Sequence, residues 1–157
     1  MEHLAWAYAE NWDVHVVALR YFTVYGTGQR PDMAIHSFIA HATADELAVV
    51  YGDGEPIRDF TYVSDAAAAT IAATAVDVPR GSVFNVAGGS SRTVNNVLRL
   101  VSEALGREVV VRHLPRQPGD VLVTRGAIDR ATRVLGWEPL VPLDDGIKQQ
   151  VVHQIGV

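Results

Sequence analysis

A short apolar run, Val14-His15-Val16-Val17-Ala18-Leu19, leads directly into a polar loop with glycines and three aromatic residues, Arg20-Tyr21-Phe22-Thr23-Val24-Tyr25-Gly26-Thr27-Gly28-Gln29-Arg30-Pro31-Asp32. The run has the composition of a strand that is covered on both faces, as in a parallel sheet. In α/β proteins, ligands tend to bind at the loops that follow such strands. This stretch therefore indicates an α/β fold with a candidate binding loop over residues 20–32.

The rest of the chain alternates between helical and strand-like apolar periods, which is typical of a layered α/β domain. We expect strands over residues 47–51, 58–63, 83–86 and 109–114, and helices over 2–12 and 129–135. Capping residues and glycines predict these further boundaries: helix starts at Asp32, at Ser64 or Asp65, at Thr93 and at Asp144, and helix ends at Gly106 and Gly136. No linker rich in Gly, Ser or Pro divides the chain, so we expect a single domain over residues 1–157.

Two of the expected helices have distinctive apolar faces. Leu4, Tyr8 and Trp12 follow one another at intervals of four along the first helix. The alanine-rich run over residues 66–76 is predicted to be a buried helix. It is too short to cross a bilayer, which needs roughly 18 apolar residues.

Composition excludes several classes of protein. Thirteen Lys and Arg residues against 18 Asp and Glu residues give a formal charge of −5, the wrong sign for binding nucleic acid through its phosphates. The chain has no cysteine, so it has neither a disulfide framework nor a thiolate nucleophile. The start of the chain lacks a basic region followed by an apolar one. We therefore expect a cytoplasmic protein with no nucleic acid or membrane as partner.

Metal and lysine chemistry have little support in the sequence. The six histidines include no pair four residues apart and no His-Glu-x-x-His motif, so we expect no metal site. Lys148 is the one lysine among 13 basic residues, and it falls in an expected helix near the C-terminus. A mechanism that needs a catalytic lysine has only that candidate.

Six short motifs occur in an order and spacing that identify a family. They are Leu19-Arg20-Tyr21-Phe22-Thr23-Val24-Tyr25-Gly26, Gln29-Arg30-Pro31-Asp32-Met33-Ala34-Ile35, Val50-Tyr51-Gly52-Asp53-Gly54-Glu55-Pro56-Ile57-Arg58-Asp59-Phe60-Thr61-Tyr62-Val63-Ser64-Asp65, Phe84-Asn85-Val86-Ala87-Gly88-Gly89, Gln117-Pro118-Gly119-Asp120-Val121 and Leu135-Gly136-Trp137-Glu138-Pro139. Together they resemble the NAD-dependent nucleotide-sugar epimerases and dehydratases of the extended short-chain dehydrogenase/reductase type. The sequences of these motifs are most similar to those of 4-epimerases acting on UDP-glucuronate or UDP-glucose.

The resemblance implies the C-terminal part of that fold: the last strands of the parallel sheet plus the small substrate-binding domain, with the N-terminal Rossmann half missing. Residues 1–31 would be the remnant of the Rossmann sheet, and residues 32–157 mainly the substrate-binding region. Family members begin with a glycine-rich turn that holds the NAD pyrophosphate, and they carry a catalytic Tyr-x-x-x-Lys pair. The 157 residues contain neither motif. We therefore expect no catalytic residue, no NAD bound to this chain alone, and no activity of the chain alone.

The resemblance also implies two principal contacts for the nucleotide sugar. Arg58 would grip the diphosphate, because a planar guanidinium can donate two parallel hydrogen bonds. The alternative is a salt bridge of Arg58 with Asp59 or Asp65. Tyr51 would flank the nucleotide base; the alternative is a core aromatic residue at the end of its strand.

Further contacts are implied near the first loop. Thr23 stands where many relatives have an asparagine that reaches the sugar or nucleotide, and the alternative is a turn hydrogen bond. Tyr21 and Phe22 match residues that border the nicotinamide and the sugar, and the alternative is loop packing. The remaining candidates for nucleotide contact in this loop and the following helix are Arg30, Met33 and Ala34.

A second diphosphate clamp is implied near residue 117. Many relatives have an arginine immediately before the Pro-Gly-Asp turn. Here that position is Gln117, with Arg116 one residue earlier. Both residues are therefore candidates for the second clamp.

Two functional hypotheses follow. In the first, the chain is the substrate-binding portion of a UDP- or dTDP-sugar epimerase or dehydratase. In the second, it is a stand-alone module that binds a nucleotide sugar or mediates protein association. The strand over residues 14–19 would pair with the first half of the intact fold, so we expect either such a half as partner or self-association through residues 4–21.

Overall fold

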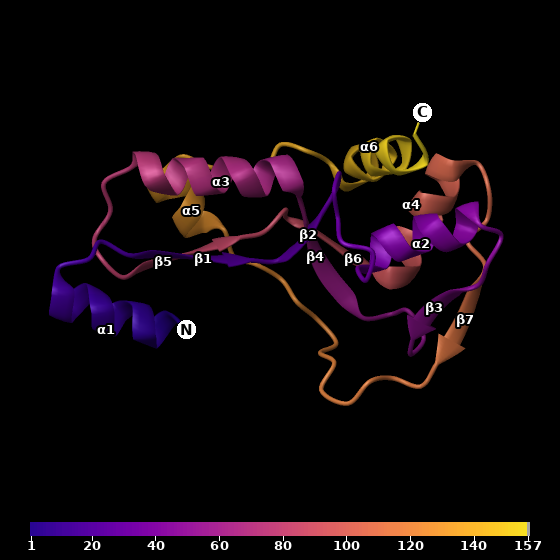
Figure 1. Cartoon of the computed structure of the whole chain (residues 1–157), viewed down its shortest axis with the longest axis horizontal. Coiled ribbons are helices and arrows are strands. Elements are labelled where there is room, and N and C mark those ends of the chain that lie inside the picture. The colour runs from indigo at the N-terminus through magenta and orange to yellow at the C-terminus, as the bar shows by residue number, and fades with distance from the viewer. Residues whose placement is uncertain (157) are drawn as a thin grey trace.

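The computed structural model describes residues 1–156 and has a mixed α/β architecture, which confirms the predicted fold class (Figure 1). The helices are α1 (Glu2–Trp12), α2 (Ala34–Thr43), α3 (Val63–Ala75), α4 (Val94–Leu105), α5 (Asp129–Leu135) and α6 (Leu143–Ile155). The strands are β1 (Val17–Tyr21), β2 (Thr23–Tyr25), β3 (Ala48–Tyr51), β4 (Ile57–Tyr62), β5 (Ser82–Val86), β6 (Ser90–Thr93) and β7 (Val111–Leu114).

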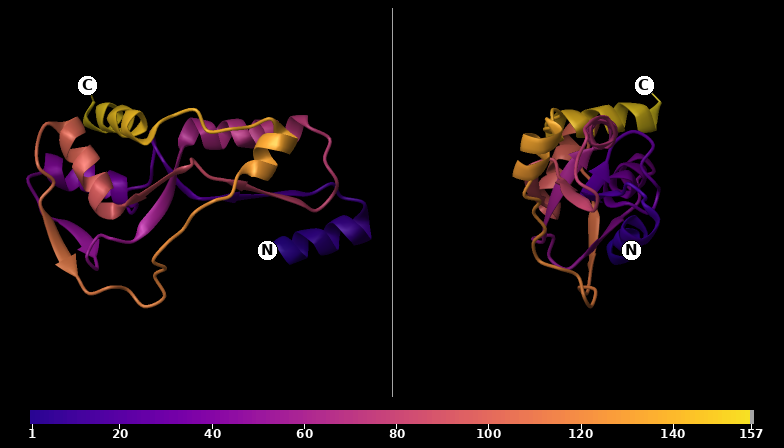
Figure 2. Two further views of the ribbon diagram at one scale, coloured as in Figure 1. Left: turned by 180° about the vertical axis from the view of Figure 1, so that it is seen from behind. Right: turned by 90° about the vertical axis from the view of Figure 1, so that its left-hand side faces the viewer.

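The strands form three small sheets. β1 and β5 are parallel, β2 and β6 flank the central β4, and β3 and β7 are parallel. Figures 1 and 2 show an elongated molecule with α1, α3 and α5 around the first sheet at one end, and α2, α4 and α6 at the other. The chain passes from β1 into β2 through Phe22 alone, so the first sheet and the central sheet meet at that residue. This junction positions the candidate site.

Each end of the molecule has its own apolar core. At the α2–α4–α6 end, the core includes Ile39, Val101 and Ile147, which are 0% exposed. Tyr25 lies in the same core, and burial raises the pKa of its phenol above the usual range. The phenol therefore stays protonated and donates a hydrogen bond to the Leu143 carbonyl (3.3 Å).

The second core lies under α3 and α5. It includes Ala69, Phe84, Val86 and Trp137. The Trp137 indole nitrogen donates to the Asp65 carbonyl (3.0 Å), so the buried ring leaves no unpaired donor. This bond ties the segment after α5 to the first turn of α3.

The first strand and loop differ from the prediction. The strand expected over residues 14–19 is β1, Val17–Tyr21, and His15 lies before it with its ring nitrogen bonded to the Val78 carbonyl (2.7 Å). The loop expected over residues 20–32 contains β2, because Thr23 to Tyr25 pair with β4 in parallel register. Composition alone did not show this short strand, since its pairing depends on a segment 37 residues away in the register Thr23↔Phe60.

Three predicted helix caps are wrong. The helices begin after Met33, Tyr62 and Pro142, with no side-chain cap bond, in place of starts at Asp32, at Ser64 or Asp65, and at Asp144. The Asp65 carboxylate instead accepts the Val141 amide hydrogen (3.0 Å), so a tertiary contact outweighs local capping. The prediction at Thr93 is confirmed: its side chain accepts the Asn96 amide hydrogen (3.1 Å). Gly106 and Gly136 end their helices in the left-handed conformation, as expected.

The apolar helix faces are more exposed than the sequence suggested. α3 buries only Asp65, Ala66 and Ala69, while Ile71 is 68% exposed, so the prediction of a buried alanine-rich helix is wrong. Ala9 is the buried residue of α1. The opposite stripe of α1 is exposed: Leu4 62%, Tyr8 50% and Trp12 63%. Within residues 1–156, no helix combines the length and the apolar character needed to cross a membrane.

Candidate nucleotide-sugar site

A cavity of about 510 Å³ lies where β1 passes into β2. Its lining combines cationic, hydroxyl, amide and aromatic side chains, namely Arg20, Tyr21, Phe22, Thr23, Arg58, Asn85 and Thr124. The residues come from the carboxyl ends of β1 and β5, from the amino ends of β2 and β4, and from the segment after β7. The cavity therefore lies at the carboxyl ends of the parallel strands β1 and β5, the position where α/β proteins tend to bind ligands.

Arg58 reaches this cavity from β4. Its Nη2 atom lies 2.5 Å from Oδ1 of Asp120, and its Nη1 atom donates to the Ile57 carbonyl (2.9 Å). The Arg58 side chain is 19% exposed and that of Asp120 is 33% exposed. The guanidinium is thus held in place beside Asp120, and it lines the cavity.

The salt-bridge partner of Arg58 differs from the two carboxylates considered in the sequence. Asp59 and Asp65 accept backbone amide hydrogens from Gly126 (3.1 Å) and Val141 (3.0 Å), and Asp120 takes their place beside Arg58. Successive residues of a strand point to opposite faces, so Asp59 cannot reach the face of Arg58. Asp120 lies 62 positions away in the sequence, and only its place in the Gln117–Val121 motif could have drawn attention to it.

Three other predicted contacts line the same cavity. Thr23 is the first residue of β2 and lies opposite Phe60 of β4. The Tyr21 hydroxyl is bonded to Oγ1 of Thr70 (2.6 Å), and the amide of Phe22 donates to the Val86 carbonyl (3.0 Å). The structure therefore brings four predicted residues together, since Arg58 faces the same space as these three.

Arg20 is a cavity residue that the sequence reasoning did not select. Its Nε and Nη2 atoms donate to both carboxylate oxygens of Glu2 (2.8 and 2.7 Å). These hydrogen bonds lower the pKa of Glu2 and raise that of Arg20. Arg20 is thereby paired with α1, which leaves Arg58 as the cavity cation with the more buried position.

A segment between β7 and α5 forms one wall of the cavity. The amide of Ile57 donates to the Leu122 carbonyl (2.8 Å), and the amide of Thr124 donates to the Ile57 carbonyl (3.0 Å). The Asn85 side chain donates to the Ala127 carbonyl (3.1 Å). These bonds fix Thr124 in the wall. Thr124 and Asn85 were not selected from the sequence, although Asn85 lies within the quoted Phe84–Gly89 motif.

Arg30 and Met33 lie in a second cavity of about 300 Å³, formed by the loop between β2 and α2. Its lining residues are Val24, Tyr25, Gly26, Thr27, Gly28, Gln29, Arg30, Met33 and Val63. The Arg30 guanidinium lies 3.7 Å from the Met33 sulfur and 3.2 Å from the Asp32 carboxylate. Ala34, the first residue of α2, is exposed and lies outside the lining of both cavities.

The other three candidates lie around the end of β3 and the turn at Asp120. Tyr51 is 46% exposed, so the alternative of a core aromatic residue is wrong. The Arg116 guanidinium donates to the Asp120 carbonyl, and Gln117 closes the turn by accepting the Asp120 amide hydrogen (3.2 Å). Arg58 and Arg116, the two arginines expected to bind the diphosphate, thus both contact Asp120.

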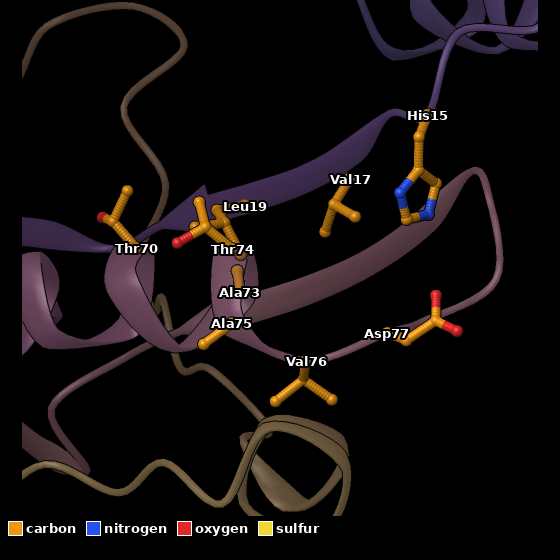
Figure 3. Close-up of a pocket in the computed structure, with 9 residues that line it drawn as sticks. All are labelled: His15, Val17, Leu19, Thr70, Ala73, Thr74, Ala75, Val76 and Asp77. Carbon is orange, nitrogen blue, oxygen red and sulfur yellow. The ribbon is translucent and has the colours of Figure 1, made fainter.

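Another cavity, of about 560 Å³, contains none of the predicted site residues. It lies between one face of β1, with Val17 and Leu19, and the side of α3 that carries Thr70 and Thr74, and His15 lines it from just before β1 (Figure 3). Its walls combine aliphatic side chains with the polar side chains of His15, Thr70, Thr74 and Asp77. Among residues 1–156, the structure shows no cluster of three or more His, Cys, Asp or Glu side chains that could hold a metal ion.

Comparisons with known proteins identify what the chain is similar to. The "NAD dependent epimerase/dehydratase family" matches residues 1–87. UDP-glucuronate 4-epimerase of Thermodesulfobacterium geofontis is 34% identical over 152 residues, which cover 96% of this chain and 46% of the relative. An uncharacterized UDP-glucose epimerase of Bacillus subtilis is 31% identical, with 97% and 48% covered.

Solved structures give the same result. UDP-glucuronic acid 4-epimerase from Bacillus cereus, in complex with UDP-glucuronic acid and NAD, superposes with a TM-score of 0.95 at 33% identity, covering 99% of this chain and 50% of that one. MoeE5 in complex with UDP-glucose and NAD gives 0.94 at 36% identity, with 99% and 52% covered. The chain thus spans about half the length of the relatives that it matches.

Proposed function

Because the chain belongs to the NAD dependent epimerase/dehydratase family, we propose that it is the nucleotide-sugar-binding portion of an NAD-dependent sugar epimerase or dehydratase. It matches the C-terminal half of the extended short-chain dehydrogenase/reductase fold. The ligand would be a UDP- or dTDP-sugar. The observation that carries the proposal is the Arg58 guanidinium, held by Asp120 and open to a cavity of about 510 Å³. That volume lies within the range of about 300–1,000 Å³ found for small-molecule sites.

In the proposed complex, Arg58 donates hydrogen bonds to the diphosphate. Charge-assisted bonds of this kind are about twice as strong as neutral ones, and the low exposure of Arg58 limits screening by water. Asp120 competes with the diphosphate for the same guanidinium. Arg116, which reaches the same turn, supplies a second positive charge.

The other candidates take the remaining parts of the ligand. Thr23 offers its hydroxyl to the sugar from the cavity wall, and exposed Tyr51 offers its ring to the nucleotide base. Arg30, Met33 and Ala34 are proposed to lie near the nucleotide, and Gln117 to shape the second clamp. A UDP-sugar is favoured over a dTDP-sugar because the solved relatives contain UDP-glucuronic acid and UDP-glucose.

The residues present do not fit NAD by themselves. The 157 residues include neither the glycine-rich turn for its pyrophosphate nor a Tyr-x-x-x-Lys pair, and the Tyr21 hydroxyl is already bonded to Thr70. We therefore propose that this chain alone neither binds NAD nor transfers hydride. Epimerase or dehydratase activity would need residues from the other half of the family fold.

A calorimetric titration tests the proposed ligand. We expect UDP, UDP-glucose and UDP-glucuronic acid to bind the chain with micromolar dissociation constants, and NAD to give no saturable heat. Absence of binding of all three uridine nucleotides at millimolar concentration would exclude a UDP-sugar as the ligand, and the same result with dTDP would exclude the proposal. Saturable NAD binding would contradict its second part.

A second candidate function, protein association, is favoured by the exposed stripe of α1. Leu4, Tyr8 and Trp12 are each at least half exposed, and the Tyr8 and Trp12 rings lie 4.6 Å apart. Within residues 1–156, β1 pairs with β5 alone, which leaves its other edge without a strand. We propose that a second copy of this chain, or a polypeptide carrying the first half of the fold, covers this surface in the cytoplasm.

The association proposal predicts a concentration-dependent dimer. Small-angle scattering should give a mass above that of the 17.0 kDa monomer, and Tyr8→Ser combined with Trp12→Ser should return it to the monomer value. The matched control is Ile71→Ser, which removes an equally exposed residue of α3 and should leave the dimer intact. A wild-type chain that stays monomeric at all concentrations would rule out self-association.

A further inference from the structure

The C-terminal helix α6 contacts the loop between β2 and α2 through one buried side chain, Gln150. Its Oε1 atom accepts the amide hydrogen of Gly26 (2.9 Å), and its Nε2 atom donates to Oε1 of Gln29 (2.9 Å). Gln150 is only 1% exposed, and it lines a cavity of about 240 Å³ together with Gly26, Gly28, Gln29, His36, His153 and Gln154. A buried amide with both ends bonded to one loop is suited to fixing the conformation of that loop.

Gln29 extends the network to both ends of the loop. Its Nε2 atom donates to the Val24 carbonyl in β2 (3.1 Å), and its Oε1 atom also accepts the amide hydrogen of His36 in the first turn of α2 (3.1 Å). Two glutamine side chains thus connect β2, the loop, α2 and α6. Because every link is a directional bond between partly or fully buried groups, loss of one leaves others without a partner.

The loop itself has few other restraints. Gly26 has a φ of 126°, a backbone conformation that L side chains rarely adopt, and Gly28 has open space where a side chain would be. The backbone bonds inside the loop join Gln29 to Gly26 (3.1 Å) and Met33 to Arg30 (3.1 Å). The two glutamines therefore supply the side-chain hydrogen bonds that hold the loop to β2, α2 and α6, while close packing against Tyr62 and Val63 restrains Gly26.

This loop forms most of the second cavity of about 300 Å³, in which Arg30 and Met33 lie. It also follows β2 (Thr23–Tyr25), whose first residue, Thr23, lines the first cavity. A change in the loop would therefore move Arg30 and Met33, and through β2 it would also shift Thr23.

We propose that Gln150 and Gln29 are positioning residues that hold the nucleotide-binding loop in its binding conformation, so that α6 controls the affinity of a site it does not line. This inference rests on the proposed function for its effect on ligand affinity. Its structural part, that one network orders the whole loop, is independent of any ligand.

Amide hydrogen exchange tests the structural part. The informative amides are those whose own hydrogen-bond acceptor is left unchanged by the substitution. Gln150→Leu should speed exchange of the His36 amide, which bonds to Gln29, by about tenfold or more. Gln29→Leu should likewise speed exchange of the Gly26 amide, which bonds to Gln150. Exchange in the double variant should be no more than about twofold faster than in either single variant, because the effects of substitutions within one hydrogen-bond network are not additive.

Gln154→Leu is the matched control. Gln154 is the same residue type one turn later on α6 and bonds to the His36 carbonyl (2.9 Å), but it has no bond to Gly26 or Gln29. It should leave the exchange of the Gly26 amide unchanged. The amide of Val101, in the apolar core of α4, reports global unfolding and should change little in any variant.

A UDP titration of the same variants tests the effect on the site. Gln150→Leu and Gln29→Leu should each weaken UDP binding by about tenfold, with Gln154→Leu within twofold of wild type. If only the directly bonded amide responds in each variant, or if UDP affinity is unchanged while the loop loosens, the inference is wrong. If wild type itself binds no UDP, the proposed function fails, and the exchange experiment still decides whether the network orders the loop.

Discussion

Replacing Arg58 with alanine is expected to weaken the binding of UDP to this chain by about a hundredfold. Two charge-assisted hydrogen bonds at the lower end of the usual range, about 1.5 kcal/mol each, amount to about 3 kcal/mol, and about 1.4 kcal/mol corresponds to a tenfold change in affinity. Arg58 is mostly buried beside Asp120, so little of this interaction is lost to screening. Calorimetric titration of wild type and variant measures the ratio of dissociation constants.

Arg92→Ala is the control for this experiment. Arg92 lies directly opposite Arg58 in the β4–β6 pairing, carries the same charge, and does not line the cavity. Its removal should change UDP affinity by less than about threefold, the effect of one exposed charge. Arg58→Lys should give an intermediate affinity because an ammonium group cannot donate two parallel bonds. If Arg58→Ala and Arg92→Ala weakened UDP binding equally, positive charge in general would govern binding, and specific hydrogen bonds from Arg58 to the diphosphate would not.

Gly88→Ala is expected to destabilise the fold by about 3 kcal/mol, the upper part of the usual range for overpacking. A Cβ atom at this position would lie 1.8 Å from the Phe60 carbonyl oxygen and 3.1 Å from the Thr61 Cα. Both are backbone atoms of the central strand β4, so no side-chain rotation can relieve the clash. Urea denaturation should show a lower midpoint for the variant.

The neighbouring Gly89 separates close packing from backbone conformation. It has a φ of 67° and no atom within 4 Å of an added Cβ. Gly89→Ala should therefore cost only the conformational penalty, about 1–2 kcal/mol. If Gly88→Ala were no more destabilising than Gly89→Ala, the close approach of Gly88 to β4 would not be the reason for the glycine.

Local sequence signals were enough to predict helix caps and helix ends that depend only on neighbouring residues. Thr93 caps α4 and Gly136 ends α5 because those bonds and dihedral angles lie within one helical turn. The Asp65 carboxylate did not cap α3, because the Val141 amide, 76 positions away, binds it. Short-range chemistry was predictable, and a competing tertiary partner was not.

In the candidate site, too, four residues were predictable from the sequence and their tertiary partners were not. The motifs led to Tyr21, Phe22, Thr23 and Arg58, which line one cavity. They did not lead to Asp120 as the partner of Arg58, since that pairing is made by the path of the chain after β7. A resemblance between motifs transfers residue positions, whereas the partner of each side chain follows from the three-dimensional arrangement.

The most direct test of the nucleotide-sugar site is a crystal structure of this chain with UDP. We predict that the pyrophosphate lies in the cavity between Thr23 and Thr124, within hydrogen-bond distance of the Arg58 guanidinium. Clear density for UDP elsewhere on the molecule, with Arg58 still paired only to Asp120, would contradict that prediction.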